Sequence, residues 1–308
     1  MSTNTKFNRI IKQICEEKGI NYTLLSRDWI TMLEYQGKTR FISGFQFDLN
    51  DHALGSIMDD KYALYDVLRA KDIPVAEHHI LFKDTNTNDY AEGHNKKDLV
   101  RDFFQKHKEI VLKSNTGSCG TGVFKITNKE DLEEVLDNLL QKNHSISYCP
   151  FYPIKSEYRM IVLDGEIQLM YKKIKPVVIG NGQDTIKDLL LAFNQPYFKD
   201  KLEEDKYNEV LPKGEVFEYD WRFNLSRGAA ISTQIEDYKR QKLVGIKNEL
   251  CKIFRIGFAS IDVIETEEDF LVLELNSGVM TENIMELIDN GEEFVKYIYS
   301  NAIDKMFQ

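Results

Sequence analysis

A carboxylate and a carboxamide close an apolar run near the end of the sequence, and together they could bind a metal ion. The run reads Phe-Leu-Val-Leu-Glu-Leu-Asn and ends with Glu274 and Asn276. Because side chains two residues apart in a strand share a face, these two point the same way. Leu271, Leu273 and Leu275 should fall on the opposite face. Two oxygen-bearing groups beside an apolar run favour a hard cation such as Mg²⁺.

A third acid precedes this run by a short interval. Asp262 lies in the β-branched segment Ala-Ser-Ile-Asp-Val-Ile, and the polar residues 265–269 separate it from the apolar run. A hairpin through these residues would place Asp262 and Glu274 on adjacent strands. Taken alone, the stretch is also consistent with a half-exposed hairpin whose acids face water.

A lysine followed by a glycine-rich loop is the strongest local signal in the chain. Lys113 ends an apolar strand-like run, and Gly117, Ser118, Gly120 and Gly122 lie in the loop that returns into another such run. Glycines let backbone N–H groups approach an anion, and a lysine adds a positive charge for phosphate. The loop opens no helix, so it is neither a Walker A loop nor a dinucleotide-binding loop. A glycine-rich hairpin without a ligand is the alternative.

An aromatic connector with an acid follows further along the chain. Phe151, Tyr152 and Pro153 form a stiff apolar segment that suits a flat base, and Glu157 could accept hydrogen bonds from ribose hydroxyls. The alternative is an ordinary loop in which Glu157 and Arg159 form a surface ion pair.

A polar loop with one arginine could bind a carboxylate or an acyl phosphate. It reads Asn-Leu-Ser-Arg-Gly-Ala and contains Asn224 and Arg227. Arginine binds such groups with two hydrogen bonds. A surface loop is the alternative, just as the basic run around Lys173 is consistent with a solvated strand face.

The order of these motifs resembles that of the ATP-grasp superfamily of carboxylate–amine ligases, over roughly residues 57–285. Further stretches resemble cyanophycin synthetases, the ligase domain of bifunctional glutathione synthetases, and ribosomal-protein glutamate ligases. The resemblance implies an α+β, ATP-grasp fold that holds the nucleotide between two α+β lobes, with a small N-terminal α/β lobe. We expect an N-terminal substrate-side lobe over 1–82, a central lobe with the glycine-rich flap over 83–150, and a C-terminal lobe with the metal site over 151–308.

The resemblance also implies roles for individual residues. Those expected to bind the nucleotide are Lys61, Lys113, Gly117, Ser118, Gly120, Gly122, Phe151, Tyr152, Pro153 and Glu157. Those expected to hold the metal are Asp262, Glu274 and Asn276. Those expected to act on the substrates are Arg159, Lys173, Asn224 and Arg227.

The implied activity is ATP-dependent formation of an amide or peptide bond through an acyl phosphate. ATP and two Mg²⁺ ions would be required, with Mn²⁺ as a substitute, and the substrates would be a small carboxylate and an amine such as an amino acid or peptide. The alternatives are a phosphotransferase or a thiol ligase of the same fold, or a nucleotide-binding protein without turnover.

Composition places further bounds on function. The 308 residues carry a net charge of −10, which argues against nucleic acid as the main partner. No apolar run approaches the roughly 20 residues that a membrane helix needs. The four cysteines are far apart, which suits free thiols in a reducing compartment. We therefore expect a cytoplasmic enzyme with no membrane partner, and a homodimer is the expected assembly.

Helices and strands must position these residues. Apolar spacing, turn residues and prolines predict helices at 5–19, 59–71, 96–107, 129–142, 184–194 and 234–256. The same signals predict strands at 22–25, 29–35, 38–42, 79–82, 109–113, 123–126 and 145–151, and hairpins at 158–171 and 259–276. Because many strand pairs are hairpins, the pattern indicates an α+β fold.

Overall fold

The computed structural model describes residues 5–84, 91–116, 122–192 and 205–308. The chain divides into two compact units, residues 1–170 with 235–308, and residues 171–234. Over the described ranges, no helix is long and apolar enough to cross a membrane.

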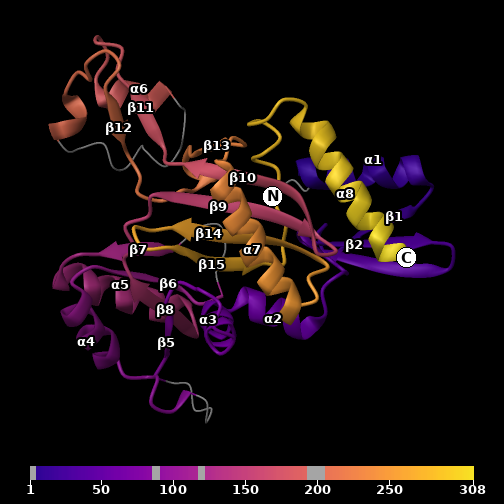
Figure 1. Ribbon diagram of the computed structural model, residues 1–308, viewed down its shortest axis with the longest axis horizontal. Helices are drawn as coiled ribbons and strands as arrows, with labels where there is room; N and C mark the ends of the chain where they lie inside the picture. The colour runs from indigo at the N-terminus through magenta and orange to yellow at the C-terminus, as the bar shows by residue number, and fades with distance from the viewer. Residues whose placement is uncertain (1–4, 85–90, 117–121, 193–204) are drawn as a thin grey trace. The chain divides into compact units, whose positions relative to one another are not determined.

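The first residues of the chain form a small antiparallel layer within the first unit, drawn in indigo and violet in Figure 1. Its elements are α1 (Lys6–Lys18), β1 (Asn21–Leu25), β2 (Ile30–Tyr35), β3 (Lys38–Ser43) and β4 (Gln46–Phe47), in the strand order β1-β2-β3-β4. We call β1–β4 the N-terminal sheet. Two short helices follow, α2 (His52–Asp59) and α3 (Lys61–Arg69).

A second antiparallel sheet, the central sheet, has two helices packed against one face. Its strand order is β5-β8-β6-β7, with β5 (His79–Phe82), β6 (Ile110–Ser114), β7 (Val123–Ile126) and β8 (Ser145–Pro150). Helices α4 (Asp98–His107) and α5 (Lys129–Lys142) contribute Val100, Leu132 and Leu136 to the core that Leu112 and Ile146 share. The opposite face of this sheet is therefore left for other contacts.

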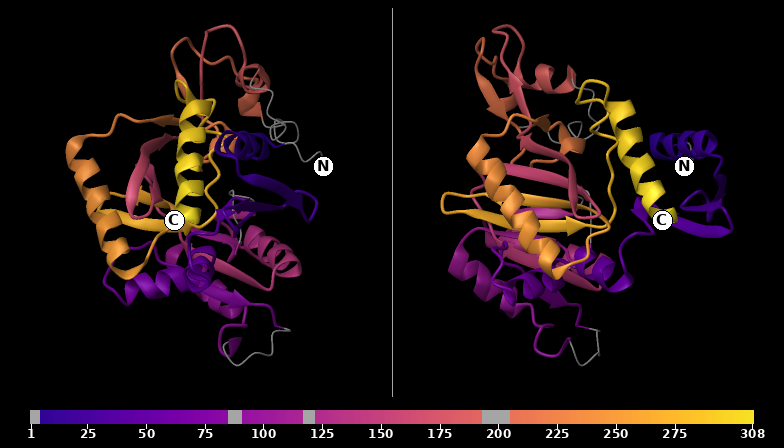
Figure 2. Two further views of the ribbon diagram at one scale, coloured as in Figure 1. Left: turned by 90° about the vertical axis from the view of Figure 1, so that its right-hand side faces the viewer. Right: turned by 45° about the vertical axis from the view of Figure 1, so that its right-hand side comes forward.

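A third group of strands completes the first unit. Strand β9 (Ser156–Leu163) pairs with β14 (Phe258–Glu265), and β14 pairs with β15 (Phe270–Asn276). The long helix α7 (Asp237–Ile253) covers one face through Leu243 and Leu250. The last helix in the sequence, α8 (Gly291–Phe307), lies beside α1 and the N-terminal sheet, as Figures 1 and 2 both show.

The second unit is small and has its own core. Strand β10 (Glu166–Ile174) begins in the first unit and ends in the second, where it pairs with β13 (Ala230–Ser232). The other elements are β11 (Val177–Ile179), α6 (Ile186–Ala192), the 3₁₀ turn η3 (Asp205–Asn208), β12 (Val216–Glu218) and the 3₁₀ turn η4 (Leu225–Arg227). Val178, Ile186, Leu190 and Leu211 form the core.

The α+β fold class is confirmed, and the hairpins lie where the sequence predicts them. The short strands β4, β11, β12 and β13, the turns η3 and η4, and the helices α2 and α8 were not predicted. Helix α2 ends at Asp59, where the 59–71 prediction had its first residue, and a new helix begins at Lys61 because Asp60 caps it. Helix α8 was missed entirely. The three expected lobes and the two boundaries between them stay predictions.

Candidate active site

The two predicted acidic metal ligands lie directly opposite each other on paired strands. Asp262 on β14 is in register with Glu274 on β15. The Asn276 carboxamide donates a hydrogen bond to Glu274 Oε1 at 3.3 Å, so these two side chains share a face as expected. The three groups offer the oxygen donors that a hard divalent cation prefers. No group of three His, Cys, Asp or Glu suited to a metal occurs in the described ranges.

The strand carrying Glu274 does not alternate strictly, contrary to our expectation. The register shifts after Asp262, because Val263 pairs with Val272 and Leu273 is the extra residue of a bulge. Phe270, Val272 and Leu275 are therefore the buried residues, and Leu271 and Leu273 are only partly buried. We expected Leu271, Leu273 and Leu275 to share the face opposite Glu274 and Asn276. This expectation was wrong for Leu271, which precedes the bulge, and for Leu273, which lies at it.

Arg159 forms an ion pair with Asp262 rather than lying apart from the metal ligands. The two residues are in register on β9 and β14, and Arg159 Nε donates to Asp262 Oδ1 at 2.7 Å. A second hydrogen bond joins Arg159 Nη2 to Asp262 Oδ2. The side chain of Asp262 is only 1% exposed, and this arginine compensates its buried charge. A cation held by Asp262 must share the carboxylate with Arg159 or displace it.

Two buried lysines lie near this acidic pair. Lys61 opens α3 and is 8% exposed, and Lys113 near the end of β6 is 7% exposed. Burial lowers the pKa of Lys61, the negative charge of Glu274 opposes this shift, and the positive charge of Lys113 adds to it. Lys61 Nζ also donates to the backbone carbonyl of Asn115 at 3.3 Å. Two ammonium groups so close together favour a polyanionic ligand such as a nucleotide polyphosphate.

The glycine-rich loop is described only at its end. Gly117, Ser118 and Gly120 lie outside the described residues. Gly122 has φ of +72°, a left-handed conformation that favours glycine. The predicted phosphate contacts of this loop stay predictions.

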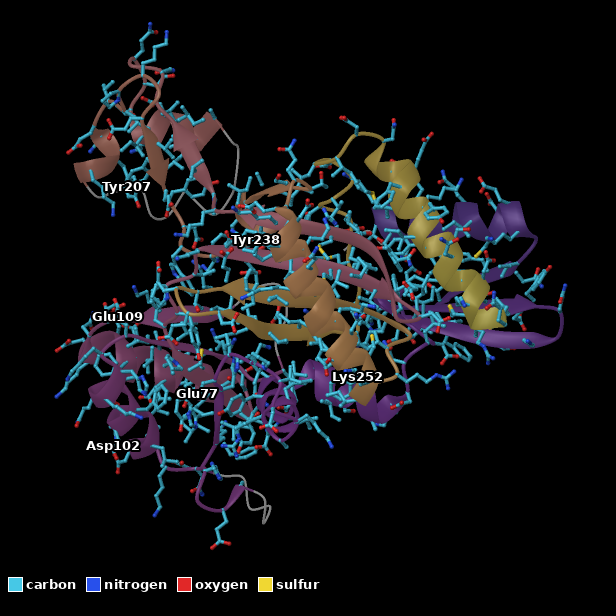
Figure 3. The ribbon with its side chains drawn as sticks, viewed as in Figure 1. Glu77, Asp102, Glu109, Tyr207, Tyr238 and Lys252 are labelled. Atoms are coloured by element: carbon cyan, nitrogen blue, oxygen red, sulfur yellow. The ribbon has the colours of Figure 1, made fainter. Side chains whose placement is uncertain are left out.

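The aromatic connector leaves β8 as predicted and is fixed at two points. The backbone N–H of Phe151 donates to the Glu109 carbonyl at 3.1 Å, and the ammonium of Lys125 lies 3.6 Å from the centre of the Phe151 ring. Tyr152 Oη accepts the backbone N–H of Glu77 at 2.8 Å, and Pro153 follows. Figure 3 labels Glu77 and Glu109 in this part of the first unit.

Glu157 is 8% exposed on β9, opposite Ile264. Arg159, its proposed partner in a surface ion pair, is paired with the buried Asp262. The expected role of Glu157 at the ribose stays a prediction.

A residue of the N-terminal sheet reaches the segment beyond the metal ligands. Gln46 Nε2 donates to Ser277 Oγ at 2.7 Å and to Asp59 Oδ2 at 3.0 Å, and Ser277 Oγ donates to Asp59 Oδ1 at 3.0 Å. No local pattern indicates this contact, because the three residues come from distant segments.

The remaining predicted residues belong to the second unit. Lys173 is buried and in register with Ile231, and Asn224 caps the η4 turn by accepting the N–H of Ser226. Arg227 Nη1 lies 3.1 Å from Asp220 Oδ2. The sequence reading missed Asp220, a nearly buried acid that also binds Arg222 at 2.8 Å.

Four buried polar atoms in the first unit were also not foreseen from the sequence. Among the described residues of this unit, His78 Nε2, His107 Nε2, Asn115 Nδ2 and Ser147 Oγ have no hydrogen-bond partner. Burial, with smaller effects of Lys113 and Lys61, lowers the pKa of His78 well below its usual value. No pattern in the sequence indicates that His78 is buried.

Part of the chain matches a protein-family model, and most of it resembles known proteins in sequence. Residues 88–175 match the model of the ATP-grasp domain of prokaryotic glutathione synthetase. Cyanophycin synthetase of Trichormus variabilis is 24% identical over 297 residues, which cover 89% of this chain and 31% of that protein. The bifunctional glutathione biosynthesis protein GshAB of Streptococcus mutans is 23% identical, with 69% of this chain and 30% of that protein covered. The chain thus spans less than a third of the length of these relatives.

Solved structures share the fold. D-alanyl-alanine synthetase A of Vibrio cholerae superposes with a TM-score of 0.59 at 12% identity, covering 99% of this chain and 94% of that one. A bifunctional glutathione synthetase of Pasteurella multocida gives a TM-score of 0.54 at 15% identity, covering 97% and 45%. These matches identify the chain as a protein of the ATP-grasp fold, similar in sequence to cyanophycin synthetases and bifunctional glutathione synthetases.

Proposed function

We propose that the chain is an ADP-forming carboxylate–amine ligase that makes an amide or peptide bond through an acyl phosphate. The observation that carries the proposal is the pairing of Asp262 with Glu274 next to Lys61 and Lys113. Oxygen ligands for a divalent cation and buried cations for phosphates thus lie together in the first unit. The substrates are an amino acid or a short peptide, as the names of the relatives suggest.

The metal site suits Mg²⁺, which Asp262, Glu274 and Asn276 would hold through oxygen atoms. Such an ion, or Mn²⁺ in its place, would neutralise phosphate charge during transfer. The fit has one condition. Arg159 engages both oxygens of Asp262, so the carboxylate must either reorient toward the ion or contact the ion and Arg159 at the same time.

The side chains of the protein would mainly position the substrates and neutralise the phosphate charges. Lys61 and Lys113 would bind the phosphates, the connector at Phe151 and Tyr152 would hold the base, and Glu157 would bind the ribose. Phosphorylation of the substrate carboxylate would give an acyl phosphate, which the amine attacks with loss of phosphate. The roles of Lys173, Asn224 and Arg227 in orienting these groups rest on the motif order alone.

The first experiment measures ADP release with panels of amino acids and dipeptides. We expect release that requires both a carboxylate and an amine, with one amide formed for each ADP. ADP release with an alcohol alone would indicate a phosphotransferase, and release with a thiol in place of the amine would indicate a thiol ligase. Nucleotide binding without any release would indicate a non-catalytic protein.

The second experiment replaces Glu274 with glutamine. Because the substitution removes one ligand charge, we expect ATP-dependent turnover to fall by at least about a hundredfold, the scale of a lost charge-stabilising group. Glu267→Gln, at the exposed tip of the same hairpin, is the matched control and should keep full turnover. Full turnover of Glu274→Gln would contradict the metal assignment.

A further inference from the structure

We infer that Gln46 is a positioning residue of the proposed ligase, which holds the end of β15 at a fixed place relative to the start of α3. The inference rests on the proposed function, because it matters only if Asn276 and Lys61 act together on a nucleotide. It gives a role to the N-terminal sheet, in which the sequence predicted no site residue.

The side chains of Gln46, Ser277 and Asp59 form a closed set of hydrogen bonds, which we call the hydrogen-bond ring. Gln46 Nε2 donates one hydrogen to Ser277 Oγ at 2.7 Å and the other to Asp59 Oδ2 at 3.0 Å. Ser277 Oγ donates its single hydrogen to Asp59 Oδ1 at 3.0 Å. With the amide turned over, Gln46 Oε1 would face the Asp59 carboxylate, which can only accept. One orientation of the amide therefore fits, and it uses every hydrogen.

Two members of the hydrogen-bond ring stand beside residues with predicted roles. Ser277 is 3% exposed and directly follows Asn276 in the sequence. Asp59 is the last residue of α2 and precedes Lys61 by two residues. Burial lowers the pKa of Lys61, and the carboxylate of Asp59 is one of the groups that oppose this shift. The amide of Gln46 thus joins the neighbour of an expected metal ligand to the neighbour of an expected phosphate-binding lysine.

The backbone of the N-terminal sheet holds the same segment and fixes where the Gln46 side chain starts. Gln46 on β4 forms an antiparallel bridge with Gly278. The backbone N–H of Val279 donates to the Phe45 carbonyl at 3.1 Å. These bonds involve no side chain, so they remain when Gln46 is substituted. A substitution at Gln46 therefore removes the hydrogen-bond ring and leaves the backbone contact of the sheet in place.

The distance between β15 and α3 matters for the proposed chemistry. Asn276 offers its carboxamide oxygen to the ion, and Lys61 offers its ammonium group to the phosphates. Groups that act together on one ligand must be held within about 0.5 Å of their productive geometry by supporting hydrogen bonds. A misplacement of about 1 Å can lower a rate by about a hundredfold. The hydrogen-bond ring is such a support, because it spans the two elements.

The burial of the three residues favours a clean test. Gln46 and Asp59 are exposed, so a substitution at Gln46 opens no buried cavity. The buried hydroxyl of Ser277 keeps its hydrogen bond to Asp59 in such a variant. We therefore expect variants at Gln46 to fold.

The variant Gln46→Met keeps the side-chain length and removes both donated hydrogens. For the substrate pair found with the amino-acid and dipeptide panels, kcat for ADP release should fall about tenfold, as when a supporting partner of a metal ligand is lost. The KM of the amino acid or peptide should change less than about twofold, because Gln46 acts through its neighbours and not on the substrate.

Calorimetric titration with a nonhydrolysable ATP analogue gives a second readout that does not depend on turnover. The affinity is measured once with Mg²⁺ and once with EDTA. The gain in affinity that Mg²⁺ provides should be at least about threefold smaller in Gln46→Met than in wild type, because Asn276 is no longer held in place. General loosening of the protein would lower both affinities and leave this gain unchanged.

An exchange of donor and acceptor separates the hydrogen-bond ring from general packing. Gln46→Glu alone places a second carboxylate against Asp59 and should lower kcat at least as much as Gln46→Met. Adding Asp59→Asn restores two of the three hydrogen bonds, because the new carboxylate at position 46 accepts from Ser277 Oγ and from the new amide at position 59. The double variant should recover kcat at least about threefold over Gln46→Glu. Absence of any recovery would contradict the inference.

Asn50→Ala is the matched control. The Asn50 side chain joins the same part of the chain to the start of β14, because it accepts the N–H of Gly257 at 2.9 Å and donates to the Phe258 carbonyl at 2.6 Å. Its loss should lower stability in urea unfolding at least as much as Gln46→Met, with kcat and the Mg²⁺ gain unchanged. Equal kinetic loss in Asn50→Ala and Gln46→Met would show general loosening and overturn the inference.

The remaining outcomes are also decisive. Unchanged kcat and Mg²⁺ gain in Gln46→Met, with wild-type turnover observed, would overturn the inference and leave the proposed function standing. A higher substrate KM with unchanged kcat would place Gln46 in contact with the substrate and overturn the positioning role. Wild-type protein that neither binds the ATP analogue nor releases ADP would overturn the proposed function, and the inference with it.

Discussion

At the scale of single residues, the buried carboxylate of Asp262 is the most consequential group. The sequence predicted that Asp262 and Glu274 would meet across a hairpin, because the two runs are close in the chain. It could not predict the ion pair with Arg159, which depends on the register between strands that are 103 residues apart. The same limit applies to His78, because its burial comes from packing that no local pattern encodes.

Replacing Arg159 with methionine should destabilise the protein in a way that Mg²⁺ partly reverses. The change removes both hydrogen bonds of Arg159 from the buried carboxylate of Asp262, which costs about 3 kcal/mol of unfolding free energy. A divalent cation at Asp262 and Glu274 would compensate that charge. Urea unfolding with EDTA and with Mg²⁺ measures both effects.

Arg101→Met is the matched control for this prediction. Arg101 also binds a carboxylate through two nitrogens, that of Glu133, but both side chains are at least 40% exposed. Its loss should cost much less stability than Arg159→Met, with no dependence on Mg²⁺. If Mg²⁺ stabilises wild type and Arg159→Met equally, the ion does not bind at Asp262.

His78 should make stability depend on pH below about 6.5. Its pKa is lowered in the folded protein, so the unfolded chain binds a proton that the folded protein does not. Stability from this group is present above the unfolded pKa and is lost as the pH falls, by up to about 1.4 kcal/mol per pH unit. Urea unfolding at pH 7.5 and 5.5 should show a smaller difference in His78→Phe than in wild type.

The exposed His144 provides the comparison. His144→Gln should keep the wild-type difference between pH 7.5 and 5.5. If His78→Phe also keeps the wild-type difference in stability between pH 7.5 and 5.5, the neutral buried ring of His78 does not cause the pH dependence.

At the scale of elements, local signals predicted helices and hairpins well and strand irregularities poorly. Helix α5 runs from Lys129 to Lys142 as predicted, because Asn128 caps it by accepting the N–H of Asp131. The bulge at Leu273 was invisible, because an extra residue is defined only against the partner strand. It matters for the site, since it sets which face carries Glu274.

The cap of α3 should affect nucleotide binding as well as stability. Asp60 accepts the N–H of Ala63 and thereby fixes the first turn, where Lys61 stands. Asp60→Ala should lower stability by about 1 kcal/mol and weaken ATP binding severalfold. Asp60→Asn, which keeps the cap, should restore most of both.

Asp51 caps α2 in the same way, through the N–H of Leu54. Asp51→Ala should therefore cost similar stability in thermal or urea unfolding, with nucleotide affinity unchanged. Equal loss of affinity in both alanine variants would indicate general loosening rather than positioning of Lys61.

At the scale of the whole molecule, the motif order predicted the fold but not how the chain is distributed between compact units. The metal and lysine residues lie in the first unit, and Lys173, Asn224 and Arg227 lie in the second. No local pattern marks residues 171–234 as a separate unit, because its core of Val178, Ile186, Leu190 and Leu211 draws on short elements. The homodimer stays a prediction.

The two arginines of the second unit, Arg222 and Arg227, allow a test of the role in catalysis that is predicted for Arg227. Arg222 and Arg227 both bind Asp220, so each substitution by methionine should cost similar stability. Only Arg227 belongs to the motif expected to act on the substrates. Arg227→Met should lower amide formation at least about tenfold with unchanged affinity for an ATP analogue, and Arg222→Met should change neither strongly. Equal kinetic loss in both variants would assign the effect to Asp220.

The association of α8 with the first residues of the chain has a consequence for biosynthesis. Tyr299 of α8 contacts the rings of Phe7 and Phe47, and Lys18 pairs with Asp304 at 2.7 Å. The N-terminal sheet therefore lacks part of its core until α8 has left the ribosome. During translation the aromatic side chains of these residues stay exposed until α8, almost three hundred residues later in the sequence, has been synthesised. A premature stop before α8 would thus disturb the beginning of the protein more than the nearby hairpin of β14 and β15.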